Sequence, residues 1–462
     1  MIARRPTTRT RHRERGVTMI LVVIAMFSML AMVALAIDVI TLYSARSEAQ
    51  RAADSAALAA AKMVVDSGVT ADPSNTTLQT AAQGWATEVA KDIAAQATIA
   101  GSAVAPGNVT VNFPNQSNPA SFAINPTVAV TVKATNLPAF FSRIWNGSPL
   151  HVSASATAEG FNPSNSSTLV GGTGVPIISR CVKPFLLPNC DPVNPNNTGA
   201  NCGGTYATFF NPTTGAITNP GQSPTGVIGE TFHLYSNCGG GPGCATPGVP
   251  NVSPGGPGGT ILYYYPVQIG STLPNACPSS CGGGSTTLES DIECCNPNPL
   301  TCGPATATIP NTVNLDTVDF PDGSGPAQSG VECLIHQRPG TGQDILNGNA
   351  LPGALSYPLQ IQVGNSHPLA GTGSLAINDY VTTSDSLVTV PVYNSGAAAP
   401  TSPVTIIGFL QLFIVQAFPG GGGPKAGEFQ VTVVNVAGCG SLATGTPVSS
   451  GSSSSLAVRL VH

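Results

Sequence analysis

The chain has 462 residues, enough for two or three domains of ordinary size. Only 8% of its residues are charged, 52 are Gly, 41 are Pro and 42% are hydrophobic, so a folded but loop-rich protein is expected. Six arginines lie in the first fifteen residues, whereas the part after residue 66 has eight Lys or Arg against seventeen Asp or Glu, which offers no basic surface for nucleic acid.

An uncharged stretch of membrane-spanning length runs from Val17 to Ile37. Its twenty-one residues would form a helix of about 31 Å, close to the ~30 Å hydrocarbon core of a bilayer. The Arg-rich tail at 1–16 precedes it and Asp38 follows it. Because positive charge favours the cytoplasmic side, we expect a single-pass cell-membrane protein with a cytoplasmic N-terminus and an extracytoplasmic bulk.

Two processing alternatives remain open. Ala34-Leu35-Ala36 satisfies the small-x-small rule of signal peptidase, which would release a chain that begins at Ile37. Gly16 resembles a prepilin peptidase site, although Leu21 stands where type IV pilin-like substrates usually carry Glu. The apolar stretch exceeds the signal-peptide core of about 7–15 residues, so an uncleaved anchor is expected.

The helix is predicted to continue from residue 38 to residue 66. One face carries Asp38 and then small or apolar residues at steps of three and four, and we call this face the small-residue seam: Asp38, Leu42, Ala45, Ala49, Ala52, Ala56, Ala59 and Met63. Alanine in a seam lets two helices approach closely. The partner could be another protein or another copy of this chain. The alternative is that the seam packs on the chain's own head domain.

Several short motifs surround this helix. Arg15-Gly16 precedes the apolar span and Asp38-Val39 ends it, followed by Tyr43, Arg46, Gln50, Asp54 and the alanine-rich run 56–61. Over residues 14–63 this pattern closely resembles the N-terminal module of Tad (tight adherence, Flp-type) pilus-assembly proteins of the TadE/TadG kind. The resemblance implies partners in the membrane among Tad pilus-assembly or pilin-like proteins, with copies of the chain itself included.

The residues that follow predict a pilin-like head within 38–160. A second helix is expected at 76–99, and strands are expected at 108–113, 127–135 and 150–159.

Residues 161–310 form a Cys-, Gly- and Pro-rich region with predicted strands at 230–236 and 260–270. An even number of cysteines outside the cytoplasm predicts disulfide bonds without revealing their connectivity. The cysteines are Cys181, Cys190, Cys202, Cys238, Cys244, Cys277, Cys281, Cys294, Cys295, Cys302, Cys333 and Cys439. Zinc is the alternative for Cys277, Cys281, Cys294 and Cys295, but no histidine lies among them and adjacent cysteines fit tetrahedral ligation poorly.

Residues 311–462 predict a β-rich C-terminal domain, with strands at 357–364, 386–393, 404–418 and 428–438. The third is almost continuously apolar, which is typical of a central strand covered on both faces. The fold class is therefore α+β: a transmembrane helix that continues into an Ala-rich helix, then the pilin-like head, the disulfide-rich loops and the β-rich domain.

Catalytic motifs are absent from the sequence, which predicts that the protein is not an enzyme. TadG-like proteins often carry a von Willebrand A domain, but 382–388 does not match its metal motif. One weak metal candidate remains, because Asp316, Asp319 and Asp322 in a Gly/Pro loop could hold Ca²⁺. Otherwise no cofactor is expected.

These features predict a membrane-anchored envelope protein that acts in assembly of a Tad/Flp-type pilus through helix–helix docking and its β-rich exterior. The alternative function is a signal-cleaved, secreted adhesin or matrix protein.

Overall fold

The computed structural model describes residues 14–72, 75–114, 125–137, 150–166, 174–194 and most of 202–461. Within 202–461 the gaps are 203, 205, 222, 224, 239–243, 245, 257–258, 271–285, 305–308, 320–324, 338–341, 348–359, 369, 371–374, 382, 420–424 and 450–455. The tail at 1–13 and the predicted site residues Cys277, Cys281 and Asp322 lie outside the described residues.

The chain divides into two compact units. The first comprises Met1–Ala56, Ala90–Val111 and Val130–Ala156, and the second comprises Ala57–Val89, Asn112–Ala129 and Thr157–His462.

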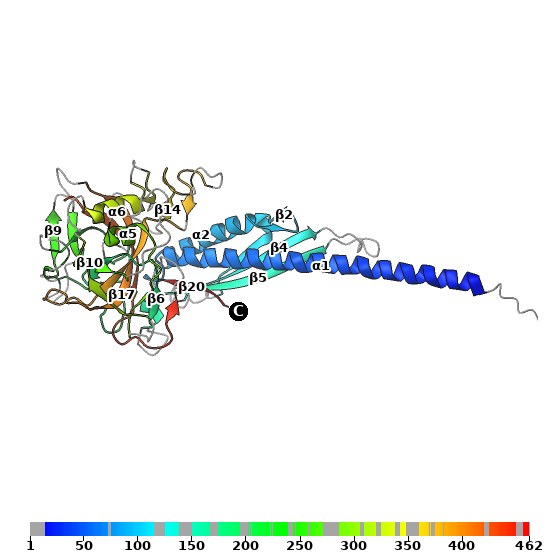
Figure 1. Cartoon of the computed structure of the whole chain (residues 1–462), viewed down its shortest axis with the longest axis horizontal. Coiled ribbons are helices and arrows are strands. Elements are labelled where there is room, and N and C mark those ends of the chain that lie inside the picture. The colour runs from blue at the N-terminus through cyan, green and yellow to red at the C-terminus, as the bar shows by residue number, and fades with distance from the viewer. Residues whose placement is uncertain are drawn as a thin grey trace, which may run out of the picture. The chain divides into compact units, whose positions relative to one another are not determined.

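Two long helices occupy the N-terminal third of the chain. Helix α1 runs without a break from Glu14 to Asp66, and α2 from Thr76 to Ala95 (Figure 1). The helix expected at 76–99 therefore ends four residues early. Thr98–Ile99 (β1) instead pairs with Ser102–Ala103 (β2) through a tight turn, in which Ala100 and Gly101 both have positive φ. Such a turn cannot continue a helix.

The three strands expected before residue 160 are present, and a fourth joins them. A short 3₁₀ turn, η1 (Pro106–Asn108), leads into the first strand. The sheet has the order β20-β5-β4-β3, with β3 at Val109–Asn112, β4 at Thr127–Leu137, β5 at Leu150–Phe161 and β20 at Ala457–Val461. Buried and half-buried residues alternate along the first half of β4, which is the period of a half-covered strand. The edge strand β20 comes from the C-terminus, a pairing that local pattern could not predict.

A closed ring of six strands forms the centre of the second unit, as far as the described residues show. Around the ring, β10 pairs with β7, β7 with β16, β16 with β17, β17 with β18, β18 with β8, and β8 with β10 again. The strands are β7 (Phe185–Pro188), β8 (Thr231–Ser236), β10 (Gly259–Gln268), β16 (Leu387–Tyr393), β17 (Val404–Ala417) and β18 (Phe429–Gly438). The Cys-rich stretch and the C-terminal stretch thus contribute strands to one small β-barrel.

Other elements surround this barrel. Strand β9 (Val252–Gly256) pairs with β10, and β12 (Thr312–Leu315) pairs with both β10 and β17. Two three-stranded sheets are built from β6 (Ile177–Ser179), β11 (Leu300–Thr301) and β19 (Val448–Ser449), and from β13 (Ile345–Asn347), β14 (Gln360–Gln362) and β15 (Tyr380–Val381). Three short helices complete the described elements: α4 (Pro163–Ser166), α5 (Thr287–Glu293) and α6 (Pro326–Leu334).

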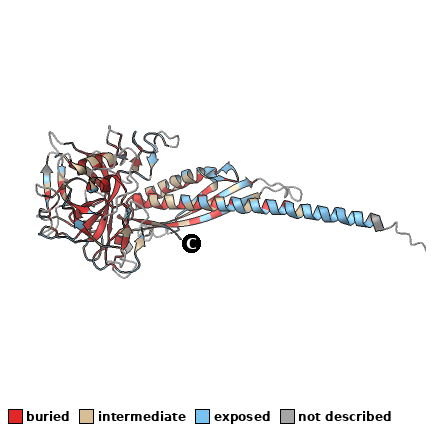
Figure 2. Ribbon diagram, viewed as in Figure 1, coloured by how far each residue is buried: buried red, intermediate tan, exposed pale blue. Residues whose placement is uncertain are grey.

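The barrel interior holds the main hydrophobic core, and buried residues concentrate in its strands (Figure 2). The rings of Phe185 and Tyr264 meet edge to face at 5.0 Å, and Phe429 lies 5.0 Å from Phe185. Strand β17 is buried along almost its whole length, as expected for a strand covered on both faces.

Candidate functional site

The N-terminal part of α1 is an apolar helix surface that this chain leaves almost uncovered. Among the described residues, α1 is the one helix long and apolar enough to cross a membrane, with a mean hydropathy of 2.9 in its best window. Its side chains from Val17 to Ile40 are nearly all exposed, and Met32 and Met19 are 75% and 72% exposed. Exposed apolar surface of this length is costly in water, so the segment requires an apolar environment.

The small-residue seam of α1 is buried inside this chain. Ala45, Ala49, Ala52 and Ala56 are between 0% and 4% exposed. Asp38 and Met63 are also buried, and Leu42 and Ala59 are half-buried. The alternative in which the seam packs on the chain itself therefore accounts for these residues, and a partner helix would have to use another face.

Side-chain hydrogen bonds of Glu48 and Gln50 connect α1 to other elements of the first unit. The carboxylate of Glu48 accepts a 2.7 Å bond from the backbone N–H of Ala100, which lies in the turn of positive φ after α2. The amide of Gln50 donates to Asp54 at 2.8 Å and to the backbone oxygen of Ser155 in β5 at 3.2 Å. Glu48 thus connects the turn to the helix, and Gln50, a residue of the N-terminal motif, connects strand β5 to it.

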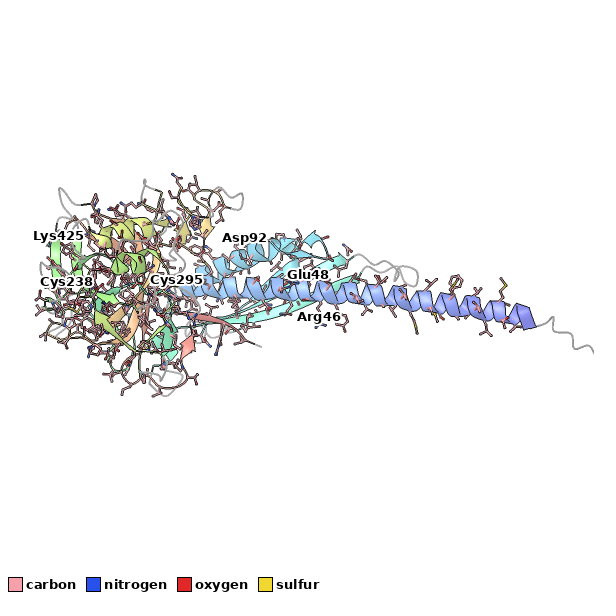
Figure 3. All side chains as sticks on the ribbon, viewed as in Figure 1. Arg46, Glu48, Asp92, Cys238, Cys295 and Lys425 are labelled. Carbon is pink, nitrogen blue, oxygen red and sulfur yellow. A yellow bond between two sulfur atoms is a disulfide. The ribbon has the colours of Figure 1, made fainter. Side chains whose placement is uncertain are left out.

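A different stripe of α1 remains exposed along the same stretch. Tyr43 is 71% exposed, and Arg46, Ser47 and Arg51 are also exposed. Figure 3 shows Arg46 and Glu48 on opposite sides of the helix. Beside Arg51 a solvent-open groove of about 490 Å³ separates α1 from the end of α2. It is lined by Glu48, Arg51, Ala52, Ser55, Ile93, Gln96, Ala97 and Thr98.

The predicted calcium loop does not assemble as a ligand cluster in the described residues. Asp316 accepts hydrogen bonds from the backbone N–H groups of Val318 and Asp319 through its Oδ1, which is a local turn. Asp319 accepts from Leu288 N at 2.8 Å, at the first turn of α5. Both carboxylates therefore accept hydrogen bonds from the backbone. Within the described ranges no group of three or more His, Cys, Asp or Glu is arranged to hold a metal.

The described cysteines form disulfides. Cys181 bonds to Cys295, Cys190 to Cys202, Cys238 to Cys244, and Cys302 to Cys439, while Cys294 and Cys333 are also disulfide-bonded. Zinc ligation by Cys294 and Cys295 is therefore wrong, because both sulfurs are oxidised.

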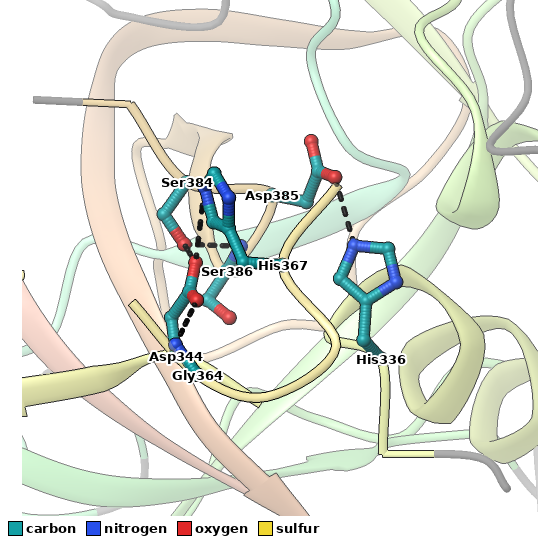
Figure 4. Close-up of polar contacts among 7 residues, drawn as sticks. All are labelled: His336, Asp344, Gly364, His367, Ser384, Asp385 and Ser386. Atoms are coloured by element: carbon teal, nitrogen blue, oxygen red, sulfur yellow. Dashed lines mark hydrogen bonds and ion pairs between the residues drawn. The ribbon is translucent and has the colours of Figure 1, made fainter. Parts of the chain in front are cut away.

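Two His–Asp contacts lie close together near α6 and the start of β16 (Figure 4). His336 Nε2 lies 2.9 Å from Asp385 Oδ2, and His367 Nε2 lies 3.8 Å from Asp344 Oδ2. Ser384 donates its hydroxyl to Asp344 at 2.5 Å. In a catalytic triad the serine hydroxyl would donate its hydrogen bond to a histidine imidazole, whereas the Ser384 hydroxyl donates to Asp344. The arrangement therefore does not resemble a catalytic triad, and its hydrogen bonds connect neighbouring loops.

Comparison with protein families gives a match at the N-terminus. Residues 16–63 match the family model described as "Putative Flp pilus-assembly TadE/G-like". This match confirms the resemblance of the N-terminal module, which covers about a tenth of the chain. Neither a curated protein nor a solved structure shows significant similarity to the chain.

Proposed function

We propose that this protein is a membrane-anchored envelope component that acts in the assembly of a Flp-type pilus. The family match at 16–63 carries the proposal, because it coincides with the exposed apolar segment of α1 and its buried continuation. In this function the Arg-rich tail lies in the cytoplasm, the apolar segment spans the membrane, and the chain after residue 38 lies outside.

We further propose that the exposed stripe of α1, with Tyr43 and Arg46, is the face that meets a pilus-assembly or pilin-like partner. The small-residue seam is occupied by the chain itself, so it is not free for this role. An exposed aromatic ring and a guanidinium next to the membrane boundary are residue types enriched in protein interfaces.

The first test is N-terminal mass spectrometry on fractionated cells. An intact N-terminus in the membrane fraction is expected. A chain starting at Val17 would indicate a pilin-like subunit cleaved after Gly16. A chain starting at Ile37 in the medium would overturn the anchor and favour the secreted adhesin.

The stripe is tested in cells by comparing pilus assembly in Tyr43→Ala and Arg46→Glu variants with that in Lys133→Glu, which changes an exposed residue of β4 outside the stripe. Pilus yield should fall in the first two while protein level in the membrane stays unchanged. Normal assembly in both variants would contradict the proposed face.

A further inference from the structure

Strand β5 is longer than the strand that pairs with its outer side. In the four-stranded sheet, β4 lies on one side of β5 and β20 on the other. Strand β20 pairs with residues 157–161, the second part of β5. No described strand pairs with residues 150–156 on that side. The first part of β5 therefore has an open side, which we call the β5 edge.

The backbone of the β5 edge turns hydrogen-bonding groups outward at three positions. Successive residues of a strand direct their N–H and C=O groups to alternate sides. Gly160 N donates to the oxygen of Pro126, the residue before β4, so the backbone groups of Gly160 face β4. Those of His151, Ser153 and Ser155, at alternate positions of opposite parity, face the open side. Such a row of groups is a template for an added strand.

The sequence of the β5 edge lacks the residues that usually prevent strand addition. Residues 150–156 read Leu-His-Val-Ser-Ala-Ser-Ala, without Pro, Lys, Asp or Glu. His151, Ser153 and Ser155 are exposed, whereas Ala154 is buried on the other face of the strand. The two serines are small and uncharged, so they leave room for a neighbouring strand.

The exposed stripe of α1 lies next to this edge. The Gln50 side chain donates to the outward oxygen of Ser155 at 3.2 Å and satisfies it as a neighbouring strand would. Arg46 lies one turn before Gln50 on the same face of the helix, and Tyr43 lies one turn before Arg46. Figure 3 shows Arg46 on the side of α1 opposite Glu48, which bonds to the turn after α2. The β5 edge and the stripe are therefore neighbours on one surface of the first unit.

We propose that the β5 edge binds an extended, acidic segment of the pilus-assembly partner as an added strand. This inference rests on the proposed function, which assigns the stripe to that partner. The added strand forms main-chain hydrogen bonds with the outward groups of β5 and turns every second side chain toward α1. Arg46 is exposed there, whereas the nearby Asp54 accepts a hydrogen bond from Gln50. An acidic residue in the added strand complements the charge of Arg46.

A helical partner fits this surface less well. A helix satisfies its own backbone groups, so it would leave the outward N–H and C=O groups of the β5 edge without a protein partner. An extended segment uses the β5 edge and the stripe together.

The test measures binding of a labelled peptide to the full chain in detergent micelles. The probe is a fluorescein-labelled heptapeptide of alternating Val and Glu, and its counterpart carries Lys in place of Glu. Fluorescence anisotropy should show saturable binding of the Glu peptide and ~10-fold weaker binding of the Lys peptide, because Arg46 attracts the first and repels the second. Arg46→Glu should reverse this preference.

A matched pair of variants tests the strand itself. Ser153→Pro removes an outward N–H without removing a bond to β4, so it should bind the Glu peptide at least ~10-fold more weakly. Ser153→Ala keeps that N–H and should bind like the wild type. A fully N-methylated Glu peptide should not bind the wild type, because it has no backbone donors.

Two results would overturn the added strand. One is equal binding of the Glu peptide by Ser153→Pro and Ser153→Ala, with both variants folded by circular dichroism. The other is undiminished binding of the methylated peptide. That measurement needs no variant, so it decides the question even where Ser153→Pro does not fold.

Pilus assembly separates this inference from the proposed function. Loss of pili in Tyr43→Ala, Arg46→Glu and Ser153→Pro, with normal assembly in Ser153→Ala, supports both. Loss in the two stripe variants with normal assembly in Ser153→Pro would keep the partner face and overturn the added strand. Normal assembly in both stripe variants would contradict the partner face and, with it, the partner assigned to the β5 edge.

Discussion

Lys183 is a buried cation that completes the end of a helix. Its Nζ donates to the backbone oxygens of Ile292 and Cys294, at 2.6 and 2.8 Å, and so satisfies carbonyls at the C-terminus of α5. Burial lowers its pKa to about 8, although the negative charges of Asp385, Asp291 and Glu293 oppose this shift.

Replacing Lys183 by Met should cost about 1–3 kcal/mol near neutral pH, since the carbonyls lose their donor. The pH dependence should also change. The pKa of Lys183 is about 8 in the folded protein and 10.5 in the unfolded chain, so the unfolded chain binds more protons between these values. This residue therefore makes the free energy of unfolding rise with pH in that window, by up to ~1.4 kcal/mol per pH unit. Denaturant titrations from pH 8 to 10.5 should therefore give a more positive slope in the wild type than in Lys183→Met, since other groups contribute equally to both. An equal slope in Lys183→Met would contradict the assignment.

Glu230 should act in the opposite sense. Burial, and then the adjacent charge of Asp191, raise its pKa from 4.5 to about 10, so the folded protein binds the extra proton across that range. The free energy of unfolding should therefore fall as pH rises from about 5 to 10. Glu230→Gln should flatten this slope, as measured by the same denaturant titrations. Asp379→Asn, which changes a carboxylate that accepts a hydrogen bond from the backbone N–H of Ala376, is the matched control.

Among the elements, α1 shows how one helix can serve two environments. Its first half is apolar on all sides, whereas its second half buries an alanine face and exposes polar residues on the other (Figure 2). The 3.6-residue period predicts the seam from sequence, but periodicity does not say which molecule covers it.

A larger side chain in the small-residue seam tests whether this chain or a partner covers the seam. Ala49→Leu should destabilise the folded protein by about 1–3 kcal/mol, because Ala49 is completely buried in a close-packed contact. Ser47→Leu, on the exposed stripe, should change stability by less than about 0.5 kcal/mol. Thermal melting of the purified proteins gives both values. Unchanged stability of Ala49→Leu combined with lost pilus assembly would show instead that the seam meets a partner.

The sequence analysis did not predict the short helices α5 and α6, although residues typical of a helix N-terminus precede or begin each of them. Thr286 caps α5 by accepting a bond from Glu289 N, and Thr-x-x-Glu is a capping-box pattern. Pro326 opens α6. Helices of seven and nine residues within Gly- and Pro-rich sequence are too short for hydrophobic periodicity to reveal them.

Strands β17 and β18 contain a buried polar pair. Gln411 and Asn435 face each other across these strands, both fully buried. The Asn435 amide donates to Gln411 Oε1 and to the backbone oxygen of Val65, near the end of α1. Gln411 interrupts the apolar sequence of β17. In the structure it takes part, through Asn435, in a polar contact between the barrel and the end of α1.

At the scale of the whole molecule, disulfides connect segments that are distant in sequence. Cys302–Cys439 spans 137 residues and joins the Cys-rich stretch to the end of β18, whereas Cys238–Cys244 spans only 6. Cross-linking removes more conformational entropy from the unfolded chain when the closed loop is longer.

Removing these two bonds should have unequal effects. The Cys302→Ser/Cys439→Ser double variant should lose about 3 kcal/mol more than Cys238→Ser/Cys244→Ser, from the ratio of 137 to 6 in the loop-closure expression. Guanidinium unfolding of both variants measures the difference. Equal losses would show that native contacts, and not loop closure, set the contribution of the longer bridge.

The sequence by itself determined the features that depend on residues close together in the chain. The apolar length of α1, the alternation in β4 and the apolar run of β17 follow from local hydrophobicity, and the motif of the N-terminal module is contiguous. Tertiary structure alone decided that the chain covers its own seam, that β20 joins β5, that six strands close into a barrel, and which cysteines pair. It also brought Asp191 next to Glu230 across thirty-nine positions of sequence. These features depend on contacts between distant segments, whose free energy is set by packing and burial in the whole fold, so no local pattern carries them.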